Sequence, residues 1–264
     1  MKVQVLVSAM NQDPKALVEK MNISSDAVII NQCDREDQVQ FSFRDREIAC
    51  YSFPDRGVGK SRNNALERAD SDICLFSDED IVYVDNYEEK IIGEFKRNLK
   101  ADMLVFNIDV EESRRTFYHT KRKRVHFYNC GRYGAVSFAF RTQKLKESGI
   151  QFSLLFGGGA KYSNGEDSLF IKEFINKGYR VYTAPVTIGR EEAGDSTWFR
   201  GYTEKFFFDR GVLYQFLYGG LAPIMALRFL FAHKEKMCRE IPVKRAYAEM
   251  KKGIIQGRIE KKQI

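Results

Sequence analysis

Hydrophobic and polar positions alternate along this chain in two rhythms. Short apolar runs typical of buried strands occur at residues 3–8, 27–31, 49–53, 73–76, 103–108, 135–141 and 179–183. Apolar positions with helical spacing occur at residues 14–21, 59–69, 86–98 and 166–177. Because strands that alternate with helices form largely parallel sheets, this order predicts an α/β fold with a mainly parallel central sheet.

The pattern becomes helical, with a heavy load of aromatic residues, after about residue 200. We therefore expect a main domain over residues 1–210 and a helical, basic extension over residues 211–264. The apolar run is broken by Gln215, Gly219-Gly220 and Arg228, so it is a poor candidate for a spanning helix, which needs about 20 predominantly apolar residues. Core packing is one interpretation of this extension. We prefer peripheral attachment to an anionic membrane surface, because residues 244–262 combine an apolar side with Lys and Arg on the other.

One strand-like run leads directly into acidic residues: Ile73-Cys74-Leu75-Phe76-Ser77-Asp78-Glu79-Asp80. In open α/β sheets, ligands bind at the carboxyl ends of the strands. Neighbouring carboxylates repel one another, and Mg2+ and Mn2+ are held by carboxylates together with substrate phosphates. The stretch thus predicts a metal–diphosphate site on Asp78 and Asp80. An acidic turn without a ligand is the alternative.

Polar loops follow three other predicted strands, at residues 8–11, 31–34 and 54–64. The last loop opens a helix and contains Lys60 and Arg62, an arrangement that favours phosphate. Gly59-Lys60-Ser61 also imitates a P-loop, and a P-loop-like NTPase is kept as an alternative. However, Pro54 stands where the P-loop requires its first glycine.

A second acidic pair, Glu166 and Asp167, follows a glycine-rich segment and begins a predicted helix. Acidic residues in a first helical turn complement the helix dipole, which is a sufficient structural explanation. The functional interpretation is that one of the carboxylates is a general base beside a substrate loop. Position along the chain does not decide between the two interpretations.

Composition narrows the class of partner and the compartment. The chain has 264 residues, 44% of them hydrophobic and 30% charged, as in a folded globular protein. A net charge of +7 and a pI near 9.0 indicate an anionic partner. The five cysteines include no CxxC pair, so neither a zinc site nor a disulfide framework is indicated, and reduced thiols in a cytoplasm are expected. No signal peptide is recognised at the N-terminus.

The motifs at residues 8–11, 31–34, 56–65, 76–80 and 165–167 occur in an order that resembles family 2 glycosyltransferases with the GT-A fold. The resemblance covers roughly residues 1–200, and the chain is similar in particular to bacterial transferases of surface-polysaccharide assembly. It implies an enzyme that uses a nucleotide-sugar donor, expected to be a UDP-sugar, together with Mn2+ or Mg2+. The implied acceptor is a glycan or a lipid-linked glycan.

The resemblance also implies roles for individual residues. The implied donor-binding residues are Ser8, Asn31, Arg56, Arg62, Asn63 and Asp78. Asp78 and Asp80 match the family's metal-binding DxD element, with Asp80 as the direct ligand. Asp167 matches the catalytic base, and Glu166 is its neighbour. With this base and no covalent nucleophile, a single displacement inverts the anomeric centre.

The sequence departs from the family at several points. Asn31-Gln32 stands where the family usually has an acidic residue that contacts the nucleotide. No Q-x-x-R-W follows Asp167, which favours a nonprocessive enzyme. Residues 190–198 are a candidate source of a further metal or substrate contact.

Basic and aromatic residues are interleaved at residues 114–128. A solvated loop, contacts to the phosphates of a lipid-linked acceptor and single-stranded nucleic acid all fit this composition; we expect no nucleic acid. A non-catalytic membrane or polyanion binder is the last alternative for the whole chain.

Overall fold

The computed structural model describes residues 1–112, 115–192 and 201–263, and the chain divides into two compact units. The first unit comprises Met1–Phe152 and Phe170–Gly194, and the second comprises Ser153–Leu169 and Asp195–Ile264. The predicted boundary at residue 210 stays a prediction.

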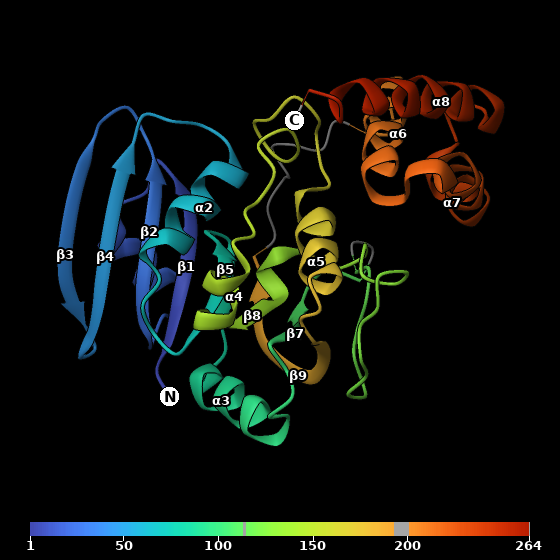
Figure 1. Cartoon of the computed structure of the whole chain (residues 1–264). Coiled ribbons are helices and arrows are strands. Elements are labelled where there is room, and N and C mark those ends of the chain that lie inside the picture. The colour runs from blue at the N-terminus through green and yellow to red at the C-terminus, as the bar shows by residue number, and fades with distance from the viewer. Residues whose placement is uncertain (113–114, 193–200, 264) are drawn as a thin grey trace. The chain divides into compact units, whose positions relative to one another are not determined.

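A nine-stranded mixed sheet forms the centre of the first unit, in the order β3-β4-β2-β1-β5-β8-β7-β9-β6 (Figure 1). Its strands are β1 (Val3–Met10), β2 (Asp26–Gln32), β3 (Asp37–Phe43), β4 (Arg46–Phe53), β5 (Ile73–Asp78), β6 (Ile81–Tyr83), β7 (Met103–Asp109), β8 (Phe138–Arg141) and β9 (Val181–Glu191). The pairs β1–β2, β1–β5, β2–β4 and β7–β9 are parallel, whereas β3, β6 and β8 pair antiparallel with their neighbours. The predicted α/β class with a mainly parallel sheet is confirmed.

Helices cover both faces of this sheet. They are α1 (Pro14–Lys20), α2 (Val58–Arg68), α3 (Tyr87–Arg97), α4 (Thr142–Ser148) and α5 (Glu166–Asn176), and a 3-10 turn, η1 (Ala135–Ser137), precedes β8. Side chains of β1 alternate between the faces: Val5 and Val7 belong to the core with α1 and α3, whereas Leu6 belongs to the core with α2, α4 and α5. Burial on both faces explains why the central strands read as continuous apolar runs.

Two strands and one helix in the first unit were not predicted. β3 is an exposed edge strand, in which only Val39, Phe41 and Phe43 supply an alternating apolar pattern. It pairs with β4 through a tight turn at Arg44 and Asp45, both of which have positive φ. The other omissions are β6 and α4, which are too short for periodicity to reveal.

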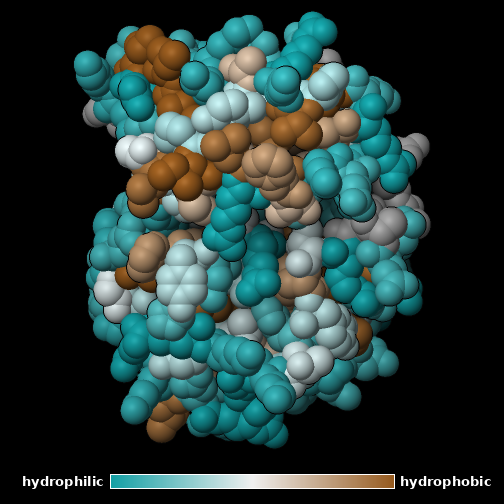
Figure 2. Space-filling view, turned by 90° about the vertical axis from the view of Figure 1, so that its right-hand side faces the viewer, coloured by the Kyte–Doolittle hydropathy of each residue, from teal (hydrophilic) through white to brown (hydrophobic). Residues whose placement is uncertain are grey.

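In the second unit, α6 (Glu204–Tyr218), the 3-10 turn η2 (Gly219–Leu221), α7 (Ala222–Met237) and α8 (Val243–Glu260) pack around an apolar core. Glycines let α6 and α8 approach closely: a Cβ at Gly253 would overlap the carbonyl oxygen of Phe208. One side of α7 packs into this core through Ala222, Ala226 and Leu230, whereas another side is apolar but exposed. Ile224, Leu227 and Phe231 are 65%, 36% and 64% exposed. Figure 2 looks at the side on which Figure 1 draws α7, and its upper half shows apolar side chains gathered among hydrophilic ones.

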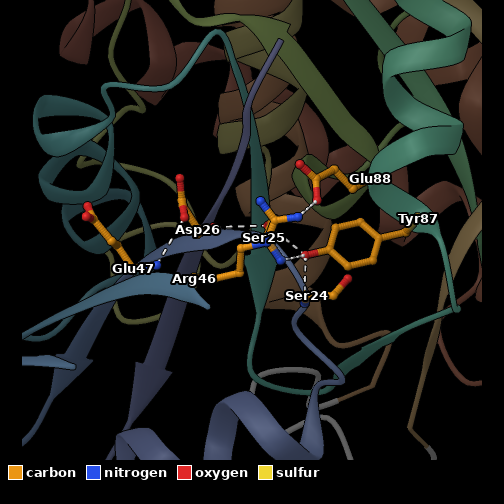
Figure 3. A network of polar contacts seen from close by, with 7 residues as sticks. All are labelled: Ser24, Ser25, Asp26, Arg46, Glu47, Tyr87 and Glu88. Atoms are coloured by element: carbon orange, nitrogen blue, oxygen red, sulfur yellow. Dashed lines mark hydrogen bonds and ion pairs between the residues drawn. The ribbon is translucent and has the colours of Figure 1, made fainter. Parts of the chain in front are cut away.

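A polar network at the amino ends of β2 and β4 fixes the start of α3 (Figure 3). The hydroxyl of Tyr87 lies 2.7 Å from Ser25 Oγ and accepts from the Ser25 backbone N–H at 3.2 Å. Arg46 forms an ion pair with Glu88 at 2.8 Å, and the backbone N–H of Glu47 donates to another carboxylate of this network. These contacts lie at the sheet edge opposite to the predicted ligand site, so they position α3 and not the ligand.

Candidate active site

The register of the sheet brings three predicted site residues to one edge. In the parallel pairing of β1 with β5, Ser8 stands opposite Asp78. In the pairing of β1 with β2, the next residue, Ala9, stands opposite Asn31. The carboxyl ends of the three adjacent strands therefore meet, where α/β sheets bind ligands.

The acidic stretch forms the turn between β5 and β6. Asp78 is the last residue of β5, and Glu79 and Asp80 make the turn. The carboxylate of Glu79 accepts a hydrogen bond of 2.7 Å from the backbone N–H of Met10, which ties the turn to β1. The Asp80 carbonyl accepts from Glu192 N at 2.8 Å. Of the three acids, Glu79 thus has a structural role.

Asp80 carries a charge that its surroundings disfavour. Burial raises the pKa of its carboxyl to about 6, and the negative charges of Asp78, Glu191 and Glu79 add to the effect. Glu191 comes close because β6 and β9 pair antiparallel with Ile81 opposite Glu191. A carboxylate in this position is stabilised by a nearby cation.

Arg62 of α2 supplies one cation at this edge. Its side chain is 4% exposed, and its Nη2 donates to both oxygens of Asp78, at 3.0 and 3.2 Å. The guanidinium also lies over the ring of Phe152, 5.3 Å from the ring centroid. Phe152 in turn stacks on Phe170 with centroids 4.0 Å apart. An aromatic floor therefore fixes Arg62 beside Asp78.

The loop that opens α2 is held against the ends of β1 and β2. Ser61 Oγ donates to Ser8 Oγ at 3.0 Å. The amide N–H of Gly57, whose φ is +124°, donates to Gln32 Oε1 at 2.8 Å, and Arg56 Nη1 donates to the Gln32 carbonyl at 2.6 Å. Phe152 was not singled out from the sequence. Gln32 and Ser61 were named as parts of motifs, but their contacts were not predicted, because the partners are set by the fold.

Two predicted donor-binding amides pair with the backbone. Asn31 is 1% exposed, accepts from Gln12 N at 3.0 Å and donates to the Gln12 carbonyl at 2.9 Å. Asn63 accepts from Phe152 N at 2.7 Å and donates to the Phe152 carbonyl at 3.0 Å. Both amides shape loops around the site. Their direct contact with a donor stays a prediction.

The carboxylates of Asp78 and Asp80 fit a divalent cation that is also bound by a substrate better than a cation enclosed by protein ligands alone. Within the described residues, no group of three or more His, Cys, Asp or Glu side chains is arranged to hold a metal ion. Asp78 and Asp80 offer carboxylate oxygens at an open edge of the sheet. Mg2+ is typically held by one or two carboxylates together with substrate phosphates. Asp78 and Asp80 therefore fit a cation that a diphosphate helps to bind.

The second acidic pair lies in the second unit, at the start of α5. Glu166 Oε2 accepts from the backbone N–H of Gly165 at 3.0 Å, next to Asp167. The preceding loop is anchored on α6, because Ser163 N donates to Asp209 Oδ2 at 3.0 Å. Asp209 is 1% exposed and pairs with Lys205 at 2.8 Å. No pattern in the sequence predicts this anchor.

Asp78 and Asp80 belong to the first unit, and Glu166 and Asp167 belong to the second. Their convergence on one cleft stays a prediction. In the candidate segment 190–198, residues 193–198 lie outside the described residues. Of its described residues, Glu191 raises the pKa of the Asp80 carboxyl, and Glu192 donates through its backbone N–H to the Asp80 carbonyl.

A mixed, mainly parallel α/β sheet with acidic residues at the carboxyl end of a central strand is the arrangement of the GT-A fold. A sequence model of glycosyl transferase family 2 matches residues 4–157, and the chain belongs to this family. The comparison with curated proteins finds no match.

Solved structures agree with the fold. TarS 1-349 from S. aureus, in complex with UDP-GlcNAc, has a TM-score of 0.61 at 16% identity, with 91% of this chain and 74% of that chain covered. The mannosyltransferase PcManGT from Pyrobaculum calidifontis, in complex with GDP-Man and Mn2+, has a TM-score of 0.55 at 13% identity, with 98% and 88% covered. The predicted family, fold and enzyme class are confirmed.

Membership of this family excludes the two alternative interpretations of the chain, a P-loop-like NTPase and a non-catalytic membrane or polyanion binder. In the loop that imitates a P-loop, Lys60 Nζ forms an ion pair with Asp55 at 2.6 Å. The segment therefore serves as the opening of α2 in a glycosyltransferase.

Proposed function

We propose that this enzyme is an inverting, metal-dependent, nonprocessive glycosyltransferase. It transfers a sugar from a nucleotide-sugar donor, UDP-linked, to a hydroxyl of a glycan or lipid-linked glycan in cell-surface polysaccharide synthesis. The observation that carries the proposal is the meeting of Ser8, Asn31 and Asp78 at one sheet edge, with Asp80 in the adjoining turn. Two similar structures are complexes with UDP-GlcNAc, and with GDP-Man and Mn2+, which supports a nucleotide sugar as donor.

Asp78 and Asp80 would hold Mn2+ or Mg2+ together with the donor's diphosphate. When bound, the cation acts as a Lewis acid for the negative charge that develops on the leaving diphosphate. Arg62, next to Asp78, adds a fixed positive charge at the same edge. Ser8 and Arg56 lie at the same loops and are proposed to contact the nucleotide.

Asp167 is proposed as the general base. Its carboxylate takes the proton of the acceptor hydroxyl while the hydroxyl oxygen forms a bond to the anomeric carbon. The bond from that carbon to the diphosphate oxygen breaks, and the electron pair leaves with the nucleoside diphosphate. Attack opposite to the leaving group inverts the anomeric centre. Glu166, which accepts from Gly165 N, orients the first turn that carries Asp167.

Variants of the two acidic sites test this assignment. Asp167→Asn should abolish turnover but leave Mn2+-dependent UDP binding unchanged, whereas Asp80→Asn should abolish both. Binding is measured by thermal shift, since a ligand at a hundred times its Kd adds about 2.7 kcal/mol of stability. Loss of UDP binding in a folded Asp167→Asn protein would contradict the assignment of the base. A UDP shift that does not depend on Mn2+ would contradict the metal site.

Membrane attachment on the cytoplasmic, inner face of the plasma membrane is proposed for the second unit. By length and composition alone, the helical segment Glu204–Met237 is apolar enough to cross a membrane, which the interruptions in its apolar run did not lead us to expect. The exposed apolar side of α7 gives a more specific argument. The second unit also exposes cations, namely Arg228 and Lys234 on α7 and Lys251 and Lys252 on α8. Apolar and basic side chains together suit an anionic interface.

Vesicle sedimentation tests the attachment. Replacing Ile224, Leu227 and Phe231 by serine should release the protein from vesicles that contain anionic lipid. Leu99→Ser is the matched control, because Leu99 is 77% exposed and belongs to the first unit. Equal sedimentation of both proteins would refute attachment through α7.

A further inference from the structure

A basic cavity of about 230 Å3 lies in the first unit, outside the acidic site. Its lining includes Lys121, Lys123, Arg124, Arg132, His119 and Tyr133. None of the described residues that line it is an Asp or a Glu. The cavity therefore has a positive potential that no adjacent carboxylate of its own lining cancels.

The cations that line this cavity differ from the neighbouring Arg122 in their ion pairing. Arg122 donates to both oxygens of Glu94, each at 2.7 Å, and Glu94 is 1% exposed. Among the described residues, no ion pair involves Lys121, Lys123, Arg124 or Arg132. The ion pair of Arg122 thus anchors the segment, while the residues on either side of it line the cavity.

Hydrogen bonds to two strands hold the cavity wall in place. Asn107 of β7 accepts from His119 N at 2.8 Å and donates to the His119 carbonyl at 3.0 Å. Thr183 of β9 donates through Oγ1 to the Lys121 carbonyl at 2.8 Å and accepts from Lys123 N at 2.9 Å. The backbone that carries the cations is therefore ordered before any ligand binds, which lowers the entropic cost of binding.

One buried polar atom in the wall lacks a partner. His119 Nε2 makes no hydrogen bond to the described residues. The imidazole stacks on Phe117, with centroids 4.9 Å apart. Burial, together with the charge of Arg132, lowers the pKa of His119 to about 4, so the ring is neutral at neutral pH. A neutral imidazole still offers a hydrogen bond to a ligand oxygen.

We infer that this cavity binds a phosphate group carried by the acceptor, at a subsite separate from the donor's diphosphate. Several unpaired Lys and Arg side chains around a small volume match a phosphate, which accepts hydrogen bonds on several oxygens. Thr183, which lines the cavity, lies near the start of β9. Glu191, which lies next to the acidic turn, is the last residue of the same strand. At about 3.3 Å per residue, the strand places them up to ~26 Å apart. The donor's diphosphate at Asp78 and Asp80 cannot fill both places.

The inference rests on the proposed function, because it assigns the phosphate to the acceptor of that reaction. Two sources share the chemistry: the diphosphate of a lipid-linked glycan, and phosphodiesters within a glycan. Two soluble probes distinguish them. Inorganic pyrophosphate represents the first source, and glycerophosphoglycerol, a phosphodiester, represents the second.

Calorimetric titration in EDTA tests the subsite without the metal site. The altered protein carries Lys121→Ala, Lys123→Ala and Arg132→Gln. The charge-matched control carries Lys90→Ala, Lys96→Ala and Lys100→Ala, all exposed in the first unit. The wild type and the control should bind one of the two probes, and the altered protein should bind it at least tenfold more weakly. Mn2+-dependent UDP binding should be equal in all three proteins.

Equal probe affinity in the altered protein and the control would overturn the inference, as would no binding of either probe to the wild type. Binding of a single-stranded oligonucleotide, without binding of either phosphate probe, would identify a nucleic-acid surface and also overturn it. If UDP binding fails in every protein while the probe result holds, the proposed donor site fails and the phosphate subsite stands.

Discussion

The guanidinium of Arg62 donates through Nη2 to both carboxylate oxygens of Asp78, at 3.0 and 3.2 Å. This contact joins α2 to the end of β5. It balances the charge of one acid in the turn, whereas Asp80 is left among negative neighbours. The two acids of the DxD turn therefore differ in electrostatic surroundings. A cation from solution is therefore expected to bind most favourably at Asp80, where it neutralises a destabilised carboxylate.

Arg62→Gln should weaken donor binding by at least tenfold and lower the free energy of unfolding by about 1.5–3 kcal/mol, the range for hydrogen bonds to charged groups. The reason is that the Arg62 side chain is 4% exposed and positions the Asp78 carboxylate. Calorimetry with UDP and Mn2+ measures the first effect, and urea unfolding measures the second. Arg35→Gln is the control, because that side chain is 62% exposed. Unchanged UDP affinity in Arg62→Gln would show that Asp78 needs no fixed partner.

Asp80→Asn should make the metal-free protein more stable at pH 7.5 than the wild type. The substitution removes a partly buried negative charge that Asp78, Glu191 and Glu79 repel. Melting temperatures in EDTA measure this effect. Addition of Mn2+ and UDP should stabilise the wild type and leave Asp80→Asn unchanged. A variant that melts below the wild type in EDTA would mean that Asp80 has a structural role instead.

The residues at the carboxyl ends of the parallel strands could be predicted from the sequence, but the contacts around them could not. Ile73-Cys74-Leu75-Phe76 is apolar because β5 is buried on both faces, so its end at Asp78 could be predicted. The register that sets Ser8 opposite Asp78 follows from adjacent parallel strands. In contrast, Asn63 is bound to Phe152, which is 89 residues away. No local pattern predicts such a pair.

The same limit applies to the basic segment and to the second unit. Composition alone allowed a solvated loop at residues 114–128. The contact of Arg122 with Glu94, 28 residues earlier, separates one anchored cation from those that line a cavity. The anchoring of Ser163 by Asp209 depends on α6, 46 residues later in the chain. These distinctions require the tertiary structure, because they depend on which elements become neighbours.

Gly253→Ala should destabilise the second unit by about 2–3 kcal/mol, as overpacking of a tight contact does. A Cβ at this position of α8 would overlap the carbonyl oxygen of Phe208 in α6, and backbone cannot move aside as a side chain can. Gly220→Ala is the matched control, because a Cβ there meets nothing within 4 Å. Thermal unfolding followed by circular dichroism compares the two. Equal melting temperatures would indicate that α6 and α8 can separate without loss of packing.

The stability of the second unit should depend on pH through the carboxylate of Glu260. Its Oε1 accepts from Lys161 Nζ at 2.7 Å, from Tyr162 OH at 2.8 Å and from Gln256 Nε2 at 2.8 Å. These hydrogen bonds, that of Lys161 first, lower the pKa of Glu260 from 4.5 to about 2. Because the folded protein binds this proton less readily than the unfolded chain, the stabilisation is complete above the unfolded pKa. It is lost as the pH falls from 4.5 towards 2.

Glu260→Gln should therefore lower the melting temperature at pH 7, and the difference from the wild type should shrink as the pH falls below 4.5. Melting curves between pH 7 and the lowest pH at which both proteins stay folded measure the change. Glu19→Gln is the control, because Glu19 is exposed on α1. It should follow the wild type at every pH. A difference between Glu260→Gln and wild type that stays constant as the pH falls would mean that packing, and not the ionised carboxylate, stabilises the end of α8.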